Sequence, residues 1–123
     1  RSSSEDSKSH LSKLISKIFK DISCDCTFSG GYPGWEPNIN SNTLKEVKSS
    51  YIKLFSSEPK VNVIHAGLEC GIIGSHYPEM DMISFGPTIL GAHSPDEKAS
   101  ISSTQKFWRF FTEVLANIPQ KVN

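Results

Sequence analysis

Large apolar side chains near the N-terminus recur at intervals of three and four residues, at Leu11, Leu14, Ile15, Ile18, Phe19 and Ile22. This spacing places them on one face of an α-helix and predicts a helix over residues 5–21. Ser2, three residues before Glu5, forms a capping-box pattern near the start of that helix.

Two later segments show the same spacing. Between residues 42 and 57 the apolar positions are Leu44, Val47, Tyr51, Leu54 and Phe55. Ser41 is a candidate N-cap for that helix, and Pro59 follows its end. Between residues 101 and 118 the apolar face is wider and consists of Phe107, Trp108, Phe110, Phe111, Val114, Leu115 and Ile118. So wide a face predicts a helix that is buried over much of its surface.

Short runs of alternating or β-branched residues predict strands over residues 24–28, 61–65 and 82–85. Residues 66–71 predict a glycine turn leading into an apolar pair, and residues 91–97 predict a loop. The alternation of helices and strands predicts an α/β fold. From about Ser41 onward, we expect the edge of a parallel sheet with crossover helices.

Residues 30–38 interrupt these patterns, because three glycines and two prolines occur among nine residues. Such a composition forbids regular structure. We therefore expect a linker between two domains at this point.

Composition and charge narrow the classes of partner. The 123 residues suffice for about one domain or parts of two. Thirteen basic and thirteen acidic side chains cancel, so neither nucleic acid nor an anionic membrane is the expected partner. We find no apolar run long enough to cross a bilayer and no secretion signal. The start at Arg1, without an initiator methionine, suggests a fragment or a processed chain.

The cysteines and histidines are the first candidates for chemistry. Cys24, Cys26 and Cys70 are an odd number, and Cys-x-Cys is too tight for an easy disulfide. We expect reduced thiols of a cytosolic protein, with a redox or metal role for Cys24 and Cys26 as the alternative.

Among the histidines, we expect His10 and His76 to lie on the surface. His65, at a strand end, is either packed or close to a ligand. His93 lies in a loop before Asp96 and Glu97, an arrangement in which carboxylates could orient a zinc ligand. One histidine cannot hold zinc alone.

Three sequence blocks, taken together, carry a family resemblance. They are Gly-Tyr-Pro-Gly-Trp at 31–35, His-Ala-Gly-Leu-Glu-Cys-Gly at 65–71, and Ser-Phe-Gly-Pro at 84–87 followed by Gly-Ala-His-Ser-Pro-Asp-Glu at 91–97. In this order and spacing they resemble the C-terminal part of the aminoacylhistidine dipeptidases. Those enzymes are di-zinc exopeptidases related to carnosinases and peptidase V. The resemblance extends from Arg1 to about Leu115.

The resemblance implies a domain organisation and a set of site residues. Residues 1–40 would end a small α/β lid and dimerisation domain, and residues 41–123 would be the C-terminal part of the catalytic domain. His93 matches the last zinc-binding histidine of the family. Arg1 resembles the lid arginine that binds the substrate carboxylate, with a surface arginine as the alternative. Gly67 and Glu69 resemble the loop lining the substrate pocket, and a structural role for Glu69 stays open.

The resemblance also implies two zinc ions, or other divalent metals, in a cytoplasmic parent enzyme that cleaves Xaa-His dipeptides. The expected partners are a small dipeptide, the rest of the parent chain and a second copy bound through the lid. The family's other metal ligands and its general base have no counterpart in this chain, so the chain alone should be inactive. The alternatives are a non-catalytic α/β module and a related acylamino-acid deacylase.

Overall fold

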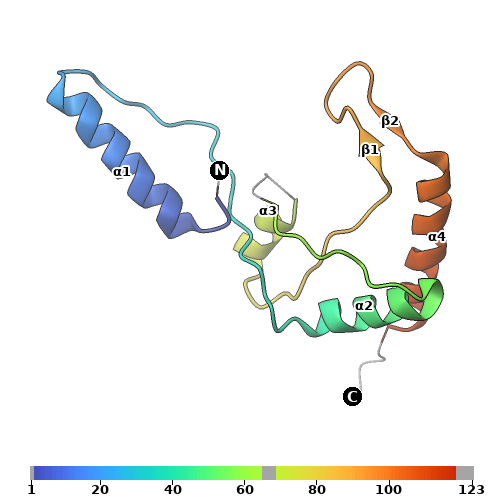
Figure 1. The fold of residues 1–123 in the computed structure, drawn as a ribbon. Helices are drawn as coiled ribbons and strands as arrows, with labels where there is room; N and C mark the ends of the chain where they lie inside the picture. Colours follow the sequence, from blue (N-terminus) through green and yellow to red (C-terminus); the bar gives the residue numbers. More distant parts are fainter. Residues whose placement is uncertain (1, 65–68, 119–123) are drawn as a thin grey trace. The chain divides into compact units, whose positions relative to one another are not determined.

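The computed structural model describes residues 2–64 and 69–118 (Figure 1). Contacts divide the chain into two compact units. The first unit combines residues 1–40 with 61–82, and the second combines residues 41–60 with 83–123. The first segment of this unit ends at residue 40, two residues after the predicted linker over residues 30–38. The assignment of residues 1–40 and 41–123 to two domains stays a prediction, since residues 61–82 group with the first unit.

The first unit begins with helix α1, Glu5–Asp21, as predicted. Ser4 is its N-cap, with its side chain accepting a hydrogen bond from the Ser7 N–H. At the other end Ser23 has a left-handed φ of 58°. The N–H groups of Ser23 and Cys24 donate to the carbonyls of Lys20 and Phe19, both at 2.9 Å. This is a Schellman motif, and it satisfies carbonyls that the end of the helix leaves unpaired.

The segment after α1 returns along the start of the helix. The Lys8 ammonium donates to the Tyr32 carbonyl, and the Gly34 N–H donates to the Glu5 carboxylate. A Cβ added at Gly34 would collide with the Ser3 backbone. Gly34, the second glycine of the first sequence block, is therefore needed because the two backbone segments approach too closely to leave room for a side chain.

Helix α3, Glu69–His76, belongs to the same unit, and it begins within the residues where the sequence predicts a glycine turn. A Cβ added at Gly71 would lie 2.6 Å from the Pro33 carbonyl oxygen, so α3 packs closely on the Gly-Tyr-Pro-Gly-Trp segment. The glycines of this short stretch predict a turn when they are considered locally. In the structure, Gly71 is the contact point of a helix instead.

In the second unit, α2 (Asn42–Phe55) and α4 (Ile101–Ala116) pack against each other. Their contact is a cluster of aromatic rings centred on Phe110, which is 8% exposed. Ring centroids of Phe110 lie 5.2 Å from Tyr51, 6.3 Å from Phe55 and 5.0 Å from Phe85. Edge-to-face and tilted rings at such spacings are favourable. The Lys53 ammonium and the Glu113 carboxylate also join the two helices at 2.9 Å.

The second unit also contains an antiparallel hairpin, in which β1 (Ile89–Leu90) pairs with β2 (Lys98–Ala99). Ile89 is opposite Ala99, and Leu90 is opposite Lys98. The predicted parallel sheet edge is therefore wrong for the described residues, whose strand pairing is antiparallel.

The predicted strands over 24–28, 61–65 and 82–85 are also wrong, as far as the structure describes them. A strand needs a neighbour for its backbone groups, and no strand lies beside these segments among residues 2–64 and 69–118. Phe85 uses its apolar side chain in the aromatic cluster without forming a strand. The mixture of helices and few strands still agrees with an α/β fold. None of the described helices has the length and apolar character required to span a membrane.

Candidate functional site

The loop that joins β1 to β2 is closed by its own hydrogen bonds. The Ser94 N–H donates to the Gly91 carbonyl at 3.0 Å, and the Ser94 hydroxyl donates to the same carbonyl at 2.6 Å. A second turn follows at once, because the Glu97 N–H donates to the Ser94 carbonyl at 3.1 Å. Pro95 is the second residue of this turn, where its fixed φ is favourable.

Gly91 is the first residue of the first turn. Its φ is +64°, and a Cβ added there would lie 2.9 Å from the Ser94 hydroxyl oxygen. Both the conformation and the close contact favour glycine.

His93 is the third residue of the first turn and has a φ of 65°. The left-handed region is unusual for a side chain with a Cβ, although histidine visits it more often than most residues. The His93 N–H donates to the Glu97 carboxylate at 2.6 Å. The side chain is exposed, and its imidazole makes no hydrogen bond to any other described residue.

This arrangement suits a metal ligand. An imidazole with both nitrogens uncommitted can offer a lone pair to zinc while the other nitrogen stays available for an orienting partner. Zinc requires three or four protein ligands, and the described residues contain no group of three or more side chains able to hold a metal. His93 therefore fits zinc as one ligand of an incomplete set.

The sequence suggested that a carboxylate after His93 could orient it as a zinc ligand. Glu97 contacts the backbone of His93 rather than its ring. The structure therefore gives Glu97 a role in the conformation of the loop.

The other predicted site residues are less well defined. Arg1 and Gly67 lie outside the described residues, as does His65. Glu69 is the exposed first residue of α3. His76 ends the same helix, and its Nδ1 lies 3.0 Å from the Ile72 carbonyl oxygen. Of the predicted site residues, the structure therefore describes the surroundings of His93, in the second unit, and of Glu69, in the first unit.

The cysteines form no disulfide in the structure. Cys24 is exposed, Cys26 and Cys70 are half-buried, and all three are free thiols.

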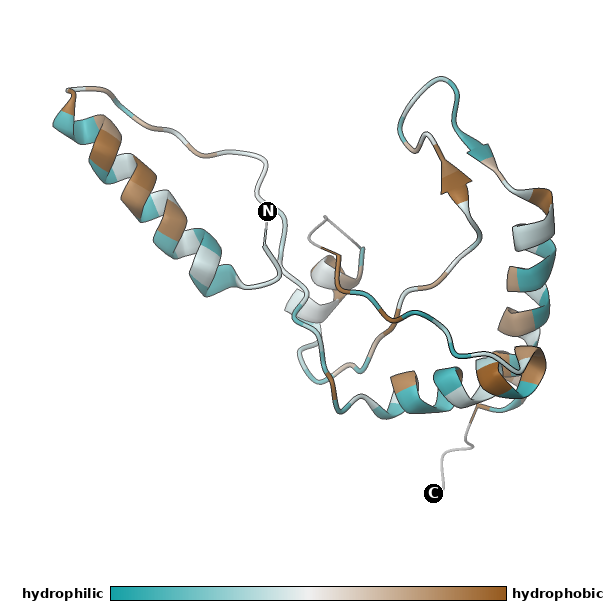
Figure 2. Ribbon diagram, viewed as in Figure 1, coloured by the Kyte–Doolittle hydropathy of each residue, from teal (hydrophilic) through white to brown (hydrophobic). Residues whose placement is uncertain are grey.

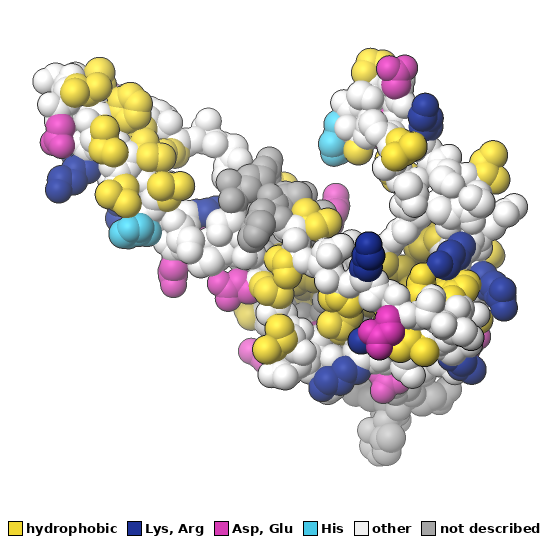
Figure 3. Space-filling view, viewed as in Figure 1, with side chains coloured by type: hydrophobic (Ala, Val, Ile, Leu, Met, Phe, Trp, Pro, Cys, Tyr) yellow, Lys and Arg dark blue, Asp and Glu magenta, His cyan; other side chains and the backbone are white. Residues whose placement is uncertain are grey.

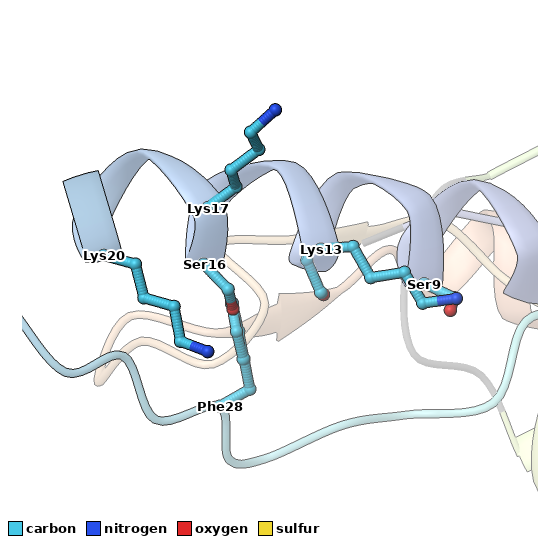
Figure 4. A pocket seen from close by; sticks show the side chains of 7 residues that line it. Ser9, Lys13, Ser16, Lys17, Lys20 and Phe28 are labelled. Carbon is cyan, nitrogen blue, oxygen red and sulfur yellow. The ribbon is translucent and has the colours of Figure 1, made fainter.

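A shallow hollow of about 550 Å³ lies on α1 beside Phe28 (Figure 4). The residues that line it are serines and lysines together with one phenylalanine, namely Ser9, Ser12, Lys13, Ser16, Lys17, Lys20 and Phe28. Lys20 reaches toward Phe28, whereas Lys17 points away from the hollow (Figure 4). The lysines do not converge on one point, so the hollow has no built binding site.

Two carboxylates have altered acidity, one in each unit. Hydrogen bonds from Lys8 and from the Gly34 backbone lower the pKa of Glu5. Hydrogen bonds from Lys53 and from Asn117 lower the pKa of Glu113. Both groups hold structural segments together, and neither belongs to the candidate loop.

The sequence and the fold are both similar to one segment of known dipeptidases. The chain is 42% identical, over 121 residues and 98% of its length, to the cytosol non-specific dipeptidase of Escherichia coli (strain K12). It also matches the crystal structure of aminoacylhistidine dipeptidase from Vibrio alginolyticus, with 38% identity, a TM-score of 0.81 and 98% of this chain covered. These two matches confirm the resemblance carried by the three sequence blocks.

The chain spans about a quarter of the relatives it matches, 25% of the Escherichia coli protein and 24% of the Vibrio protein. No family model matches it. The similarity therefore lies with one segment of each of these longer proteins.

Sequence reasoning identified His93 but missed how the loop holds it. The signal was present in Gly-Ala-His-Ser-Pro-Asp-Glu, since glycine, serine and proline at these positions favour consecutive turns. The contact between Glu97 and the His93 backbone has no such signature. It depends on how the second turn returns the chain to the first.

Proposed function

We propose that this chain is part of a zinc-dependent cytoplasmic dipeptidase that hydrolyses Xaa-His dipeptides. The observation that carries the proposal is the match to dipeptidases over 98% of the chain. The exposed and uncommitted imidazole of His93, on a loop closed by hydrogen bonds, supports it. The cytoplasmic location rests on the name of the Escherichia coli relative.

In this proposal the two parts of the chain have separate tasks. Residues 1–40 end a lid and dimerisation domain, through which a second copy binds. Residues 41–123 contribute the C-terminal part of the catalytic domain. The rest of the parent chain supplies the remaining metal ligands and the general base.

His93 would hold one of two zinc ions through its neutral imidazole. When bound, the metal supplies Lewis-acid polarisation of the peptide carbonyl and lowers the pKa of a bound water. The hairpin loop keeps the His93 backbone in one conformation. Arg1 would bind the substrate carboxylate through its planar pair of donors, and Gly67 and Glu69 would line the pocket.

The test is made on the full-length protein that contains this chain. Zinc content and the hydrolysis of an Xaa-His dipeptide, an Xaa-Gly dipeptide and an N-acyl amino acid are measured for the wild type, His93→Ala and His10→Ala. His10 is an exposed histidine of α1 and is the matched control. We expect His93→Ala to remove or displace a metal ion and to abolish turnover, while His10→Ala leaves both unchanged.

The outcomes separate the alternatives. Faster cleavage of the N-acyl amino acid than of either dipeptide would identify a deacylase instead. Unchanged zinc content and turnover in His93→Ala would contradict the metal-binding role of His93. Equal rates on the two dipeptides would contradict the preference for Xaa-His.

A further inference from the structure

We propose that Glu97 is a positioning residue for His93. Its carboxylate holds the His93 backbone in the left-handed conformation from which the imidazole would bind a metal ion. The effect on metal binding rests on the proposed function. The effect on the loop does not, and it can be measured without metal.

The central contact is the hydrogen bond from the His93 N–H to the Glu97 carboxylate, at 2.6 Å. A hydrogen bond to an ionised acceptor is shorter and stronger than a neutral one. It forms at the residue whose φ of 65° is least favourable in the loop for a side chain with a Cβ. The carboxylate therefore stabilises the part of the loop that most needs it.

The second turn brings this carboxylate into place. The Glu97 N–H is anchored to the Ser94 carbonyl at 3.1 Å, and Ser94 is itself anchored twice to Gly91. Strands β1 and β2 fix the two ends of the loop. Glu97 is therefore held on its own backbone while its side chain reaches back to His93.

The base of the hairpin is tied to the start of α4. The Ser100 N–H donates to the Thr88 carbonyl at 3.0 Å, and the Thr88 N–H donates to the Ser103 hydroxyl at 2.9 Å. These hydrogen bonds connect the hairpin to α4, whose aromatic rings form the core of the second unit. The position of His93 therefore depends also on the packing of the second unit, at residues that would not touch a bound metal ion.

This chain of contacts explains why Glu97 should affect a metal that it does not touch. An exposed imidazole on a mobile loop would lose conformational entropy on binding a metal. A backbone already held in the binding conformation avoids that loss. Partners that orient a metal ligand typically change metal affinity by about 10- to 100-fold when they are removed.

The experiment compares Glu97→Ala and Glu97→Gln in the full-length protein with Asp96→Asn. Asp96→Asn removes the same charge from the preceding residue, whose side chain makes no hydrogen bond or ion pair with any described residue. Glutamine keeps an oxygen that can accept the His93 N–H. With ¹⁵N-labelled histidine, the hydrogen exchange of the His93 amide is measured in the metal-free protein, and zinc affinity is measured by competition with a chelator.

We expect Glu97→Ala to speed exchange of the His93 amide at least about tenfold, because its acceptor is lost. We expect the same variant to weaken zinc binding by about tenfold or more. Glu97→Gln should restore most of both, and Asp96→Asn should change neither.

Unchanged exchange in Glu97→Ala would overturn the positioning role. So would an equal weakening of zinc binding by Asp96→Asn and Glu97→Gln, which would show that only charge matters. If the wild type binds no zinc, the proposed function fails, and the exchange measurement alone decides the role of Glu97.

Discussion

Helices α1 and α4 are nearly equal in length, and each has an apolar face, which is wider in α4. Their surroundings differ greatly. Phe110 of α4 is 8% exposed and contacts rings from α2 and from the segment before the hairpin. No residue of α1 is buried, and Ile18 and Ile22 are 60% and 64% exposed. Hydrophobic residues recur along the ribbon of α1 (Figure 2), and yellow apolar side chains gather at that end of the visible face (Figure 3).

The comparison shows that an apolar stripe specifies a helix and the face it should bury, but supplies no partner for that face. α4 itself shows both situations. Its Phe110 side is covered, whereas Ile101, Trp108 and Leu115, spaced seven residues apart, are 79%, 62% and 50% exposed. An apolar residue stabilises a fold only when a second element removes it from water.

The largest difference between the helices should appear on deletion of a core ring. Phe110→Ala is expected to lower the free energy of unfolding of the second unit by about 3–4 kcal/mol, since it leaves a cavity among three rings. Phe19→Ala, on the 42% exposed ring of α1, should cost less than about 1 kcal/mol. Urea unfolding of the 123-residue chain, followed by Trp108 fluorescence in a Trp35→Phe background for the first variant and by circular dichroism for the second, measures both. Equal losses would contradict the difference between the helices.

The N-caps provide a smaller comparison. Ser41 is 3% exposed, and its hydroxyl accepts the Leu44 N–H at 2.8 Å, whereas Ser4 of α1 accepts the Ser7 N–H at 3.3 Å. Ser41→Ala should cost about 1–2 kcal/mol and Ser4→Ala about 0.5 kcal/mol. Thermal unfolding of the two variants gives the ratio. A larger loss for Ser4→Ala would show that α1 is better protected in solution than its exposure indicates.

A charge placed on the apolar face of α1 tests whether that face is covered. Ile18→Lys should change the stability of the 123-residue chain by no more than about 0.5 kcal/mol, because the side chain already contacts water. Urea midpoints and sedimentation are measured together, with Ser12→Lys on the polar side as the control. A loss of more than about 1.5 kcal/mol for Ile18→Lys alone would reveal a partner on this face.

The smallest effect concerns pH. The pKa of Glu113 lies below its ordinary value of 4.5 because Lys53 and Asn117 donate hydrogen bonds to its carboxylate. A carboxyl whose pKa is lowered by folding stabilises the protein above that ordinary value, and this contribution disappears as pH falls through the lowered pKa. The wild type should therefore lose more stability than Glu113→Gln between about pH 5 and pH 3.

Glu5→Gln is the corresponding variant in the first unit, where Lys8 and the Gly34 backbone lower the pKa of Glu5. Urea midpoints at several pH values measure both variants. Identical pH dependence for the wild type and Glu113→Gln would contradict the role of the Lys53 contact.

Helices with strong periodicity were predictable from the sequence. The helices predicted over 5–21, 42–57 and 101–118 correspond to α1, α2 and α4, with ends displaced by two residues or fewer. Ser41 is the N-cap expected for α2. Helical hydrogen bonds join residues four apart, so propensity, apolar spacing and capping act within one segment. His93 was likewise recognisable as a loop residue because glycine and proline flank it.

Contacts between distant segments decided the rest. The runs over 24–28 and 82–85 have the composition of strands, yet strand formation depends on a partner that local sequence does not specify. Gly71 locally predicted a turn, but in the structure it is part of α3. Because it has no side chain, the helix can approach the backbone at Pro33 closely. The carboxylate of Glu97 reaches the His93 backbone only after two turns fold the loop on itself. Local sequence therefore determined which segments are helical and where His93 lies, whereas the tertiary structure determined which apolar faces are buried and how the histidine is held.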